Sequence, residues 1–198
     1  MRIPYTILAL ALGAGSPLAA QVGHTPASSP YQDILRGKSV TFLYGDIGGD
    51  GGRIGVGPHH GPSYGARFDV RVSGPLQFGV SLSRAKLERL VVSAADSVKT
   101  RVKGPVDQDL TMIELALQLN LTGSKTWHHL APYVAGGVGY AHGSSLPAGA
   151  PRDSSGYNFG GKLYIAPTAG VRIFLGQTVH LRLEARQLFW KLSYPLSY

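Results

Sequence analysis

The chain has 198 residues, no cysteine and a formal net charge of +8. The absence of thiols excludes disulfides and thiolate metal sites, and the length fits a single domain beside any targeting segment. The basic residues are spread over alternating segments and loops without a long tract, which argues against nucleic acid as a partner.

Residues 1–20 are typical of a secretory signal peptide: Arg2 is followed by an apolar run and by small residues that end at Ala20. We expect export and cleavage near Ala20. The apolar run is shorter than the roughly 20 residues that a spanning helix needs, which argues against a membrane anchor. Residues 21–37 show no strand pattern and predict a periplasmic linker or a short helix, with Ser29 as cap and Pro30 at the first position.

Seven segments are predicted as strands, and the clearest alternate apolar and polar residues one for one. In residues 64–72, Tyr, Ala, Phe, Val and Val occupy one face, and Gly, Arg, Asp and Arg the other. Helix is the alternative for residues 107–121, because Leu, Glu and Gln are good helix formers, but six apolar residues at period two favour a strand. The expected strands are about 39–45, 63–73, 76 onward, 107–121, 130–141, 157–174 and 178–192.

The connections between these segments alternate in length. Long ones are expected at about 46–62, 93–106 and 143–156, and short ones at 74–75, 122–129 and 175–177. Short turns at one end and long loops at the other are typical of outer-membrane β-barrels. A soluble barrel has no reason to separate its loops by length in this way.

With its export signal, this loop rhythm and the strands PYVAGGVGYA and LRLEAR, the chain resembles the OmpA/OmpX-like family of small outer-membrane β-barrels over residues 38–192. The resemblance implies an all-β, antiparallel up-and-down transmembrane barrel of eight strands in residues 38–198, assembled by the barrel-insertion machinery. Only seven strands are recognised, whereas bacterial single-chain barrels have even numbers. Because residues 193–198 are too short to cross again, we expect that the closing strand is missing; a split first strand or irregular closure are the alternatives.

Alternation alone does not say which face points inward, since soluble ligand-binding barrels enclose their apolar side. Here the polar face carries charges of both signs, and buried charges need partners. We therefore expect an interior polar network, with a specific pair between Glu184 and Arg67 or Arg71. The network comprises Arg67, Asp69, Arg71, Glu114, Arg182, Glu184 and Arg186, with His180 beside it.

The apolar face then meets lipid, and aromatic residues near the strand ends are expected to form interfacial girdles. The expected girdle residues are Tyr44, Tyr64, Trp127, Tyr133, Tyr140, Tyr157, Phe174, Phe189 and Trp190.

Candidate chemistry is sparse. The pairs His59–His60 and His128–His129 have no spaced acidic partner, so we expect no metal site. An outer-membrane lipid-modifying enzyme would need His and Ser together at the outer rim, which loop residues could supply, but no nucleophile motif is present. We expect no enzyme activity and no cofactor. The rim candidates are His59, His60 and His142 with Ser63, Ser144 and Ser145.

The sequence therefore predicts a small barrel in the outer membrane of a Gram-negative-type bacterium, with a structural, membrane-integrity or surface-contact role. Its expected partners are outer-membrane lipid and lipopolysaccharide, and the basic loop with Lys99, Arg101 and Lys103 is a candidate contact for polyanions. A narrow channel, a lipid-modifying enzyme and a soluble ligand-binding barrel are the alternatives.

Overall fold

The computed structural model describes residues 29–52, 55–93, 95–146, 149–150 and 153–192. The expected signal peptide and the C-terminal residues 193–198 lie outside this part of the chain. Over the described residues there is no helix that is long and apolar enough to cross a membrane. The regular structure consists of strands β1 (Tyr31–Asp33), β2 (Lys38–Ile47), β3 (Gly61–Ser73), β4 (Leu76–Val92), β5 (Val102–Asn120), β6 (Lys125–Trp127), β7 (Leu130–Gly143), β8 (Gly161–Phe174), β9 (His180–Arg186) and β10 (Phe189–Trp190).

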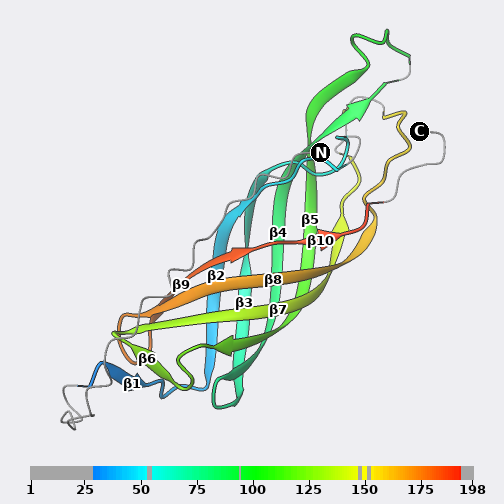
Figure 1. The fold of residues 1–198 in the computed structure, drawn as a ribbon. Coiled ribbons are helices and arrows are strands. Elements are labelled where there is room, and N and C mark those ends of the chain that lie inside the picture. Colours follow the sequence, from blue (N-terminus) through cyan, green and yellow to red (C-terminus); the bar gives the residue numbers. More distant parts are fainter. Residues whose placement is uncertain (1–28, 53–54, 94, 147–148, 151–152, 193–198) are drawn as a thin grey trace, which may run out of the picture.

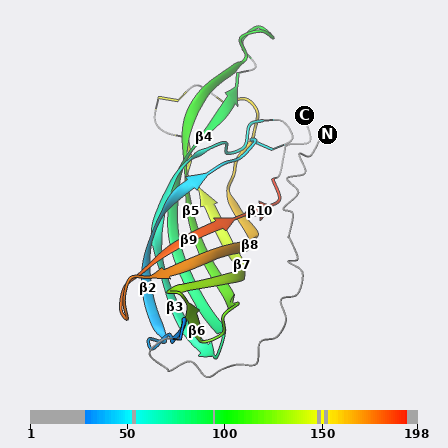
Figure 2. The same cartoon turned by 60° about the vertical axis from the view of Figure 1, so that its left-hand side comes forward.

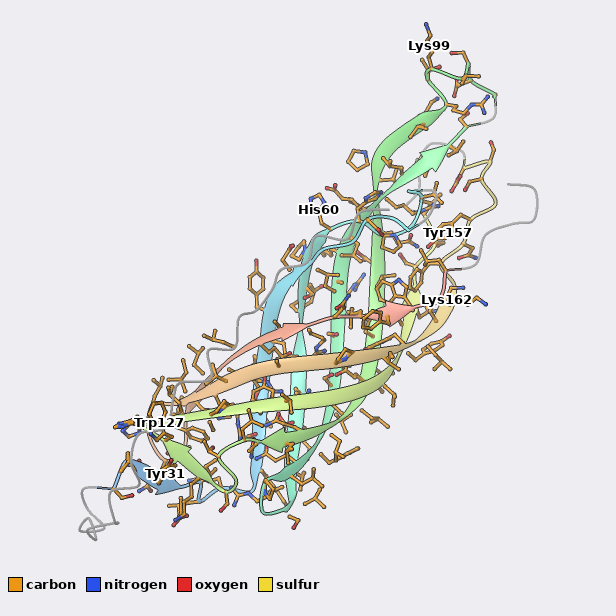
Figure 3. All side chains as sticks on the ribbon, viewed as in Figure 1. Tyr31, His60, Lys99, Trp127, Tyr157 and Lys162 are labelled. Atoms are coloured by element: carbon orange, nitrogen blue, oxygen red, sulfur yellow. The ribbon has the colours of Figure 1, made fainter. Side chains whose placement is uncertain are left out.

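The strands form one antiparallel up-and-down sheet in the order β2-β3-β4-β5-β7-β8-β9. The sheet curls about a long axis, and the β4–β5 hairpin extends beyond the other strands at one end (Figures 1 and 2). Lys99 marks this hairpin end, whereas Tyr31 and Trp127, which face each other where β1 pairs with β6, mark the opposite end, called the base below (Figure 3).

The seven expected strands are confirmed as β2, β3, β4, β5, β7, β8 and β9, and the strand prediction for residues 107–121 is correct. β9 is interrupted at residues 187–188, but β10 continues its register along β8, from Arg186 opposite Thr168 to Phe189 opposite Ile165. The break lies beside Pro167, whose carbonyl accepts from the Gln187 N–H but which has no N–H to donate.

Three boundaries differ from expectation. The helix considered for the segment after Ser29 is wrong, because residues 31–33 form β1 and pair with β6. The loop expected at 93–106 is shorter, because β5 begins at Val102 and extends the hairpin. Residues 157–160 precede β8 rather than belonging to it, and Tyr157 and Phe159 are buried.

The expected closure into an eight-stranded barrel is not found. Among the described residues, β2 pairs only with β3 and β9 only with β8, which leaves a seam between the two edges. The physical reason is the odd number of strands. In a seven-stranded antiparallel meander the first and last strands run in the same direction, so β2 and β9 cannot continue the antiparallel pattern with each other.

The two faces of the sheet differ as expected. Outward side chains are apolar: Phe42, Leu82 and Leu117 are among the large hydrophobic residues that are exposed. Inward side chains at the base half are polar or charged, including Arg67, Asp69, Gln118 and Arg172. The register brings them together, since Arg67 lies opposite Ser81 and Ser81 lies opposite Glu114 across three strands.

The interior is apolar toward the hairpin end. Leu87 and Leu110 from β4 and β5 pack there, covered by the loop residues Val56, Tyr157 and Phe159. Trp190 of β10 packs edge-on against Phe159 and Tyr164, with ring centroids 5.5 Å and 6.3 Å away. The loops between β2 and β3 and between β7 and β8 therefore close this end of the curled sheet with side chains of their own.

Candidate functional site

The charged network on the concave face is the candidate site, and its first centre is Asp69 on β3. The Asp69 carboxylate accepts from Arg67 Nε at 2.8 Å and from Arg182 Nη1 of β9 at 3.4 Å. Arg182 also donates through Nε to Glu184 at 2.8 Å and through Nη2 to Gln118 at 3.1 Å. Arg182 therefore links β9 to β3 and β5 across the interior, past the inner side of β2.

The second centre consists of two glutamates that share Arg186. Arg186 donates to Glu114 of β5 at 3.1 Å and to Glu184 at 2.6 Å. Glu114 is also 4.0 Å from Arg67, which joins the two centres. The Tyr133 hydroxyl donates to Glu184 at 2.9 Å. Asp69 and Glu184 thus each accept hydrogen bonds from at least two donors, whereas Glu114 Oε1 has no hydrogen-bond partner among the described residues.

The expected pair between Glu184 and Arg67 or Arg71 is wrong. On a strand, residues two apart share a face, so Arg182 and Arg186 lie on either side of Glu184 and bind it first. Arg71 lies nearer the base, where it donates to the carbonyls of Ile34 at 2.6 Å and Arg36 at 3.3 Å. Of the seven expected network residues, six are joined by ion pairs and Arg71 instead anchors the N-terminal segment.

Some members of the site were not expected. Tyr133, Gln118 and Asn120 are buried beside the charges, and Arg172 of β8 donates to Asn120 Oδ1 at 2.9 Å. The alternation contained the signal for two of them, because Tyr133 shares its parity with the inward Ala131 and Ala141, and Arg172 shares its parity with the inward Ala166.

Burial contradicts the expected aromatic girdles for some residues, and the others show only that their side chains point outward. Tyr44, Tyr64, Tyr140, Trp127 and Phe189 are exposed, whereas Tyr133 and Tyr157 are buried in the interior. Trp190 belongs to the apolar interior cluster, and Phe174 is half-buried with its ring 5.4 Å from that of His180. Tyr157 is retained inside because the Arg89 guanidinium lies 5.2 Å from its ring centre.

The rim histidines and serines are only partly gathered. His60, Ser144 and Ser145 line one groove of about 650 Å³ outside the hairpin end. The His59 ring lies 2.9 Å from the Gly55 carbonyl. Within the described ranges, no group of three or more histidine, aspartate or glutamate side chains is arranged to hold a metal ion.

The basic loop lies at the tip of the β4–β5 hairpin, farthest from the base (Figure 3). Lys103 forms an ion pair with Asp96 at 2.6 Å, and the hydrogen bond from Lys103 together with one from Ser93 lowers the pKa of the Asp96 carboxyl. Ser97 and Thr100 tighten the turn through their hydroxyls, 2.9 Å apart. The charge of Lys103 is therefore partly neutralised, and Lys99 and Arg101 remain for an outside contact.

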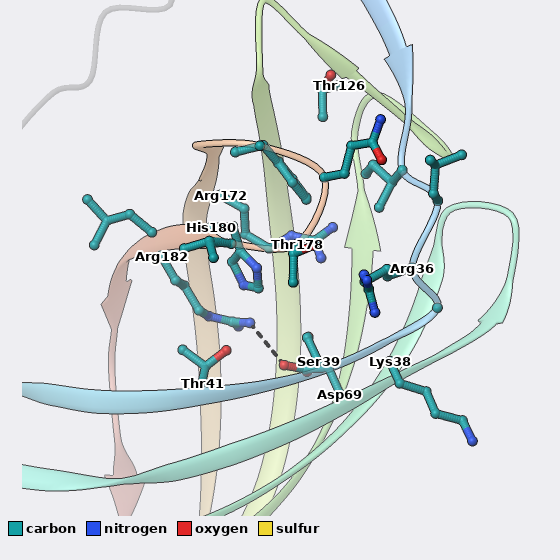
Figure 4. Close-up of a pocket in the computed structure, with 18 of the residues that line it drawn as sticks. Arg36, Lys38, Ser39, Thr41, Asp69, Thr126, Arg172, Thr178, His180 and Arg182 are labelled. Carbon is teal, nitrogen blue, oxygen red and sulfur yellow. Dashed lines mark hydrogen bonds and ion pairs between the residues drawn. The ribbon is translucent and has the colours of Figure 1, made fainter.

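A cavity of about 720 Å³ opens at the base, between β2, the β8–β9 turn and the segment after β1 (Figure 4). Arg172, His180 and Arg182 line it on one side and Ser39 and Thr41 on the other. Searches against protein-family models, curated proteins and solved structures found no match.

Proposed function

We propose that this chain is a small outer-membrane β-barrel protein with a structural and surface-contact role. The observation that carries the proposal is a continuous outward band of exposed apolar side chains. On β5 every outward position from residue 113 to 119 is Ile or Leu, Leu121 directly after the strand continues the pattern, and all of these side chains are exposed. A soluble monomer rarely exposes so large an apolar surface.

The dimensions of the band suit a bilayer. Nine residues from Ile113 to Leu121 match the roughly 9–11 residues of a tilted membrane-spanning strand. On β4 the outward apolar run ends at Leu82, and the next outward residue, Arg84, forms an ion pair with Asp109 of β5. The band therefore gives way to charges toward the hairpin end.

Exposed tyrosines lie at this change. Tyr44 pairs with Tyr64, and Tyr64 lies opposite Arg84, so two aromatic rings flank the first charged row. Tyr140 on β7 likewise precedes the exposed His142. Amphipathic rings at the border between apolar and charged surface are typical of membrane interfaces, and this supports the hairpin end as the outer side.

The interior favours a structural role over a channel. Arg67, Gln118 and Tyr133 are fully buried and fill the middle of the curled sheet, and ion pairs join the opposing walls. The interior also disfavours the soluble ligand-binding barrel, because its base half is lined by charges and its apolar half is filled by side chains such as Leu87, Leu110 and Phe159.

The seam sets a condition on the proposal. Unpaired backbone groups are too costly in lipid, so the β2 and β9 edges need backbone partners there. Either parallel pairing between β2 and β9 or an added antiparallel strand supplies them. Single cysteines introduced at Phe42 and Leu183, in a chain without native cysteine, would form a disulfide readily only in the first case.

The hairpin tip is the proposed contact for lipopolysaccharide. Lys99 lies at the far end of the hairpin and its charge is not part of the Lys103–Asp96 pair. We expect Lys99→Gln to weaken binding to lipopolysaccharide vesicles about five-fold at low salt, because one lysine near an anionic surface contributes about 1 kcal/mol. Lys103→Gln should have a smaller effect, and salt should remove the difference.

Cell fractionation with gel mobility before and after boiling tests the central proposal. Recovery in the outer membrane with a heat-dependent shift supports it, and a soluble periplasmic species contradicts it. A matched pair of variants sharpens the test. Leu117→Lys lies in the band and Val98→Lys lies at the hairpin tip, where Val98 is 76% exposed.

In lipid, a lysine at the middle of the band costs about 2–4 kcal/mol, so Leu117→Lys should lower the folded fraction strongly and Val98→Lys should not. In a soluble protein both substitutions replace an exposed apolar side chain and both should be nearly neutral. Equal, small effects would therefore overturn the proposal even if the protein pellets with membranes.

A further inference from the structure

The charges at the base half of the interior do not balance. Three carboxylates, those of Asp69, Glu114 and Glu184, are shared among the guanidinium groups of the network. Four inward guanidinium groups face these carboxylates, which leaves an excess of one: Arg67, Arg172, Arg182 and Arg186. The half-buried Arg71 lies beyond them at the base. A buried excess of charge is unfavourable unless an ion of opposite sign compensates it.

Arg172 carries much of this excess. It is 3% exposed and, among the described residues, forms no ion pair with a carboxylate. Its Nη2 donates to Asn120, while its Nε has no hydrogen-bond partner in the described chain. Arg172 also lies directly opposite Arg182 on the neighbouring strand. Like charges in facing positions repel each other. Arg182 is compensated by Asp69 and Glu184, so Arg172 is the cation of this pair that has no anion.

Arg172 and Arg182 line the base cavity, and other polar groups there lack partners as well. Within the described residues, His180 Nε2 and Thr41 Oγ1 belong to the cavity lining and are buried without a hydrogen-bond partner. The guanidinium and hydroxyl groups, together with a protonated His180 nitrogen, are donors. Figure 4 shows Arg172, His180 and Arg182 together on one side of the cavity, with Lys38 pointing away from it.

The cavity contains two carboxylates, and neither neutralises Arg172. Asp69 is held by Arg67 and Arg182, and Asp33 lies in β1 with an exposed side chain. The remaining lining toward the outside is apolar, with Val40, Phe42 and Leu181 exposed along the seam. The site therefore combines a buried cationic end with an apolar outer side.

We propose that this cavity binds an oxyanion, a phosphate group carried by a lipid headgroup or by free phosphate. Guanidinium groups bind phosphate oxygens in a bidentate way, and a volume of about 720 Å³ accommodates a headgroup. The apolar seam beside the cations gives an acyl chain a path outward. The inference goes beyond the structural role proposed above, and its free-phosphate arm does not depend on a membrane.

The first experiment uses the folded full chain in neutral detergent micelles, titrated with inorganic phosphate at constant ionic strength against chloride. Heat flow gives the dissociation constant, and the unfolding temperature is measured in parallel. We expect saturable binding and a higher unfolding temperature in phosphate than in chloride.

The variants assign the binding to the cavity. Arg172→Gln should weaken phosphate binding at least ten-fold and lose the phosphate-dependent shift in unfolding temperature. Arg84→Gln, the same substitution at an exposed guanidinium outside the cavity, should leave both unchanged. If Arg172→Gln does not fold, Thr41→Val replaces it, because Thr41 lines the cavity and its buried Oγ1 has no hydrogen-bond partner in the described chain.

A purely structural Arg172 predicts a different pattern. In chloride alone, Arg172→Gln should unfold no earlier than the original chain, since it removes an uncompensated buried charge. A clear loss of stability in chloride, together with unchanged phosphate affinity, would overturn the proposal.

The second arm distinguishes the sources of phosphate. Dihexanoyl phosphatidic acid is compared with dihexanoyl phosphatidylcholine in the same micelles. Preference for phosphatidic acid over free phosphate, lost in Arg172→Gln, supports a lipid headgroup, and equal affinity for both supports free phosphate. Absence of any Arg172-dependent binding to either probe would show that the cavity is not an oxyanion site.

Discussion

The two halves of the interior differ in polarity. Toward the hairpin end the core is apolar, with Leu87, Leu110 and Phe159 almost completely buried. Toward the base it consists of guanidinium groups and carboxylates joined by ion pairs, beside an open cavity. Both halves lie on the same concave face of the same strands, so the difference follows from what covers each end.

At the hairpin end the covering loops contribute apolar side chains, which exclude water and favour an apolar core. At the base, the described part of the chain contributes a short covering segment around Ile34, whose carbonyl accepts from Arg71 and whose N–H donates to the Ser124 carbonyl. We therefore expect the hairpin half to tolerate conservative apolar changes, whereas the base half depends on each of its carboxylates.

The largest effect is expected from Asp69→Asn. The substitution keeps the shape of the side chain but leaves Arg67 and Arg182 without their shared anion, and breaking a buried ion pair costs about 3–5 kcal/mol. Urea unfolding from detergent micelles, followed by far-ultraviolet circular dichroism, measures the loss. Asp109→Asn, which breaks the exposed pair with Arg84, should cost less than about 1 kcal/mol. Similar losses for both variants would remove the distinction between buried and surface pairs.

A slightly smaller loss is expected from Leu110→Ala in the apolar half. Leu110 is 0% exposed and belongs to the interior cluster, and removing such a side chain costs about 2–4 kcal/mol through lost burial and a cavity. The fluorescence of Trp190, which belongs to the same cluster, should report the loosened packing before unfolding. Val98→Ala at the exposed hairpin tip provides the control. A Leu110→Ala loss near zero would indicate that the apolar half does not support the fold.

Two adjacent glycines of β7 test how closely the charged half is packed. A methyl group on Gly137 would lie 2.9 Å from the Glu114 carboxylate carbon, whereas nothing lies within 4 Å of one on Gly136. Gly137→Ala should cost about 2 kcal/mol through overpacking, and Gly136→Ala should be neutral. Equal results by urea unfolding would mean that Glu114 moves aside freely and that the network is looser than its distances indicate.

The sequence sufficed for the strands and for the direction of the faces. In residues 64–72 and 113–121 every second residue is apolar. Charged side chains occupy the opposite face of these strands, and they find partners of opposite charge only if that face points into the interior. The same rule would have placed Tyr133 and Arg172 inside, because Tyr133 shares its parity with the buried Ala131 and Arg172 shares its parity with the buried Ala166 and Thr168. The girdle prediction followed closeness to strand ends and ignored this parity.

Alternation does not predict which charged side chains of the network pair with each other, or whether the two edge strands of the sheet pair. The pairing of Glu184 with Arg182 and Arg186 depends on side-chain reach along β9, and the base site of Arg71 depends on where the segment after β1 folds back. Closure depends on strand number and stagger around the whole sheet. The odd count was visible in the sequence, but only the pairing showed two free edges.

The smallest effect concerns the loop that covers the apolar half. Asp153 accepts from Arg89 Nη2 at 2.7 Å and from the Ser155 N–H at 2.9 Å, which holds the segment before β8 against β4. Burial raises the pKa of the Asp153 carboxyl, but the hydrogen bonds from Ser155 and Arg89 lower it by more. The pKa therefore lies below its ordinary value.

A carboxyl with a lowered pKa in the folded state stabilises the fold above its unfolded pKa of about 3.9, and the contribution disappears as the pH falls through the lowered value. We expect Asp153→Asn to be about 1 kcal/mol less stable than the original chain at pH 7. The difference should begin to shrink below about pH 4, where the carboxyl of the unfolded chain takes up a proton, and should disappear as the pH falls through the lowered pKa of the folded chain. Urea unfolding of both chains between pH 7 and pH 3 measures it, and the other carboxylates cancel in the comparison. A difference that stays constant with pH would show that the charge of Asp153 does not hold the loop in place. Packing would then account for the stability of the apolar half.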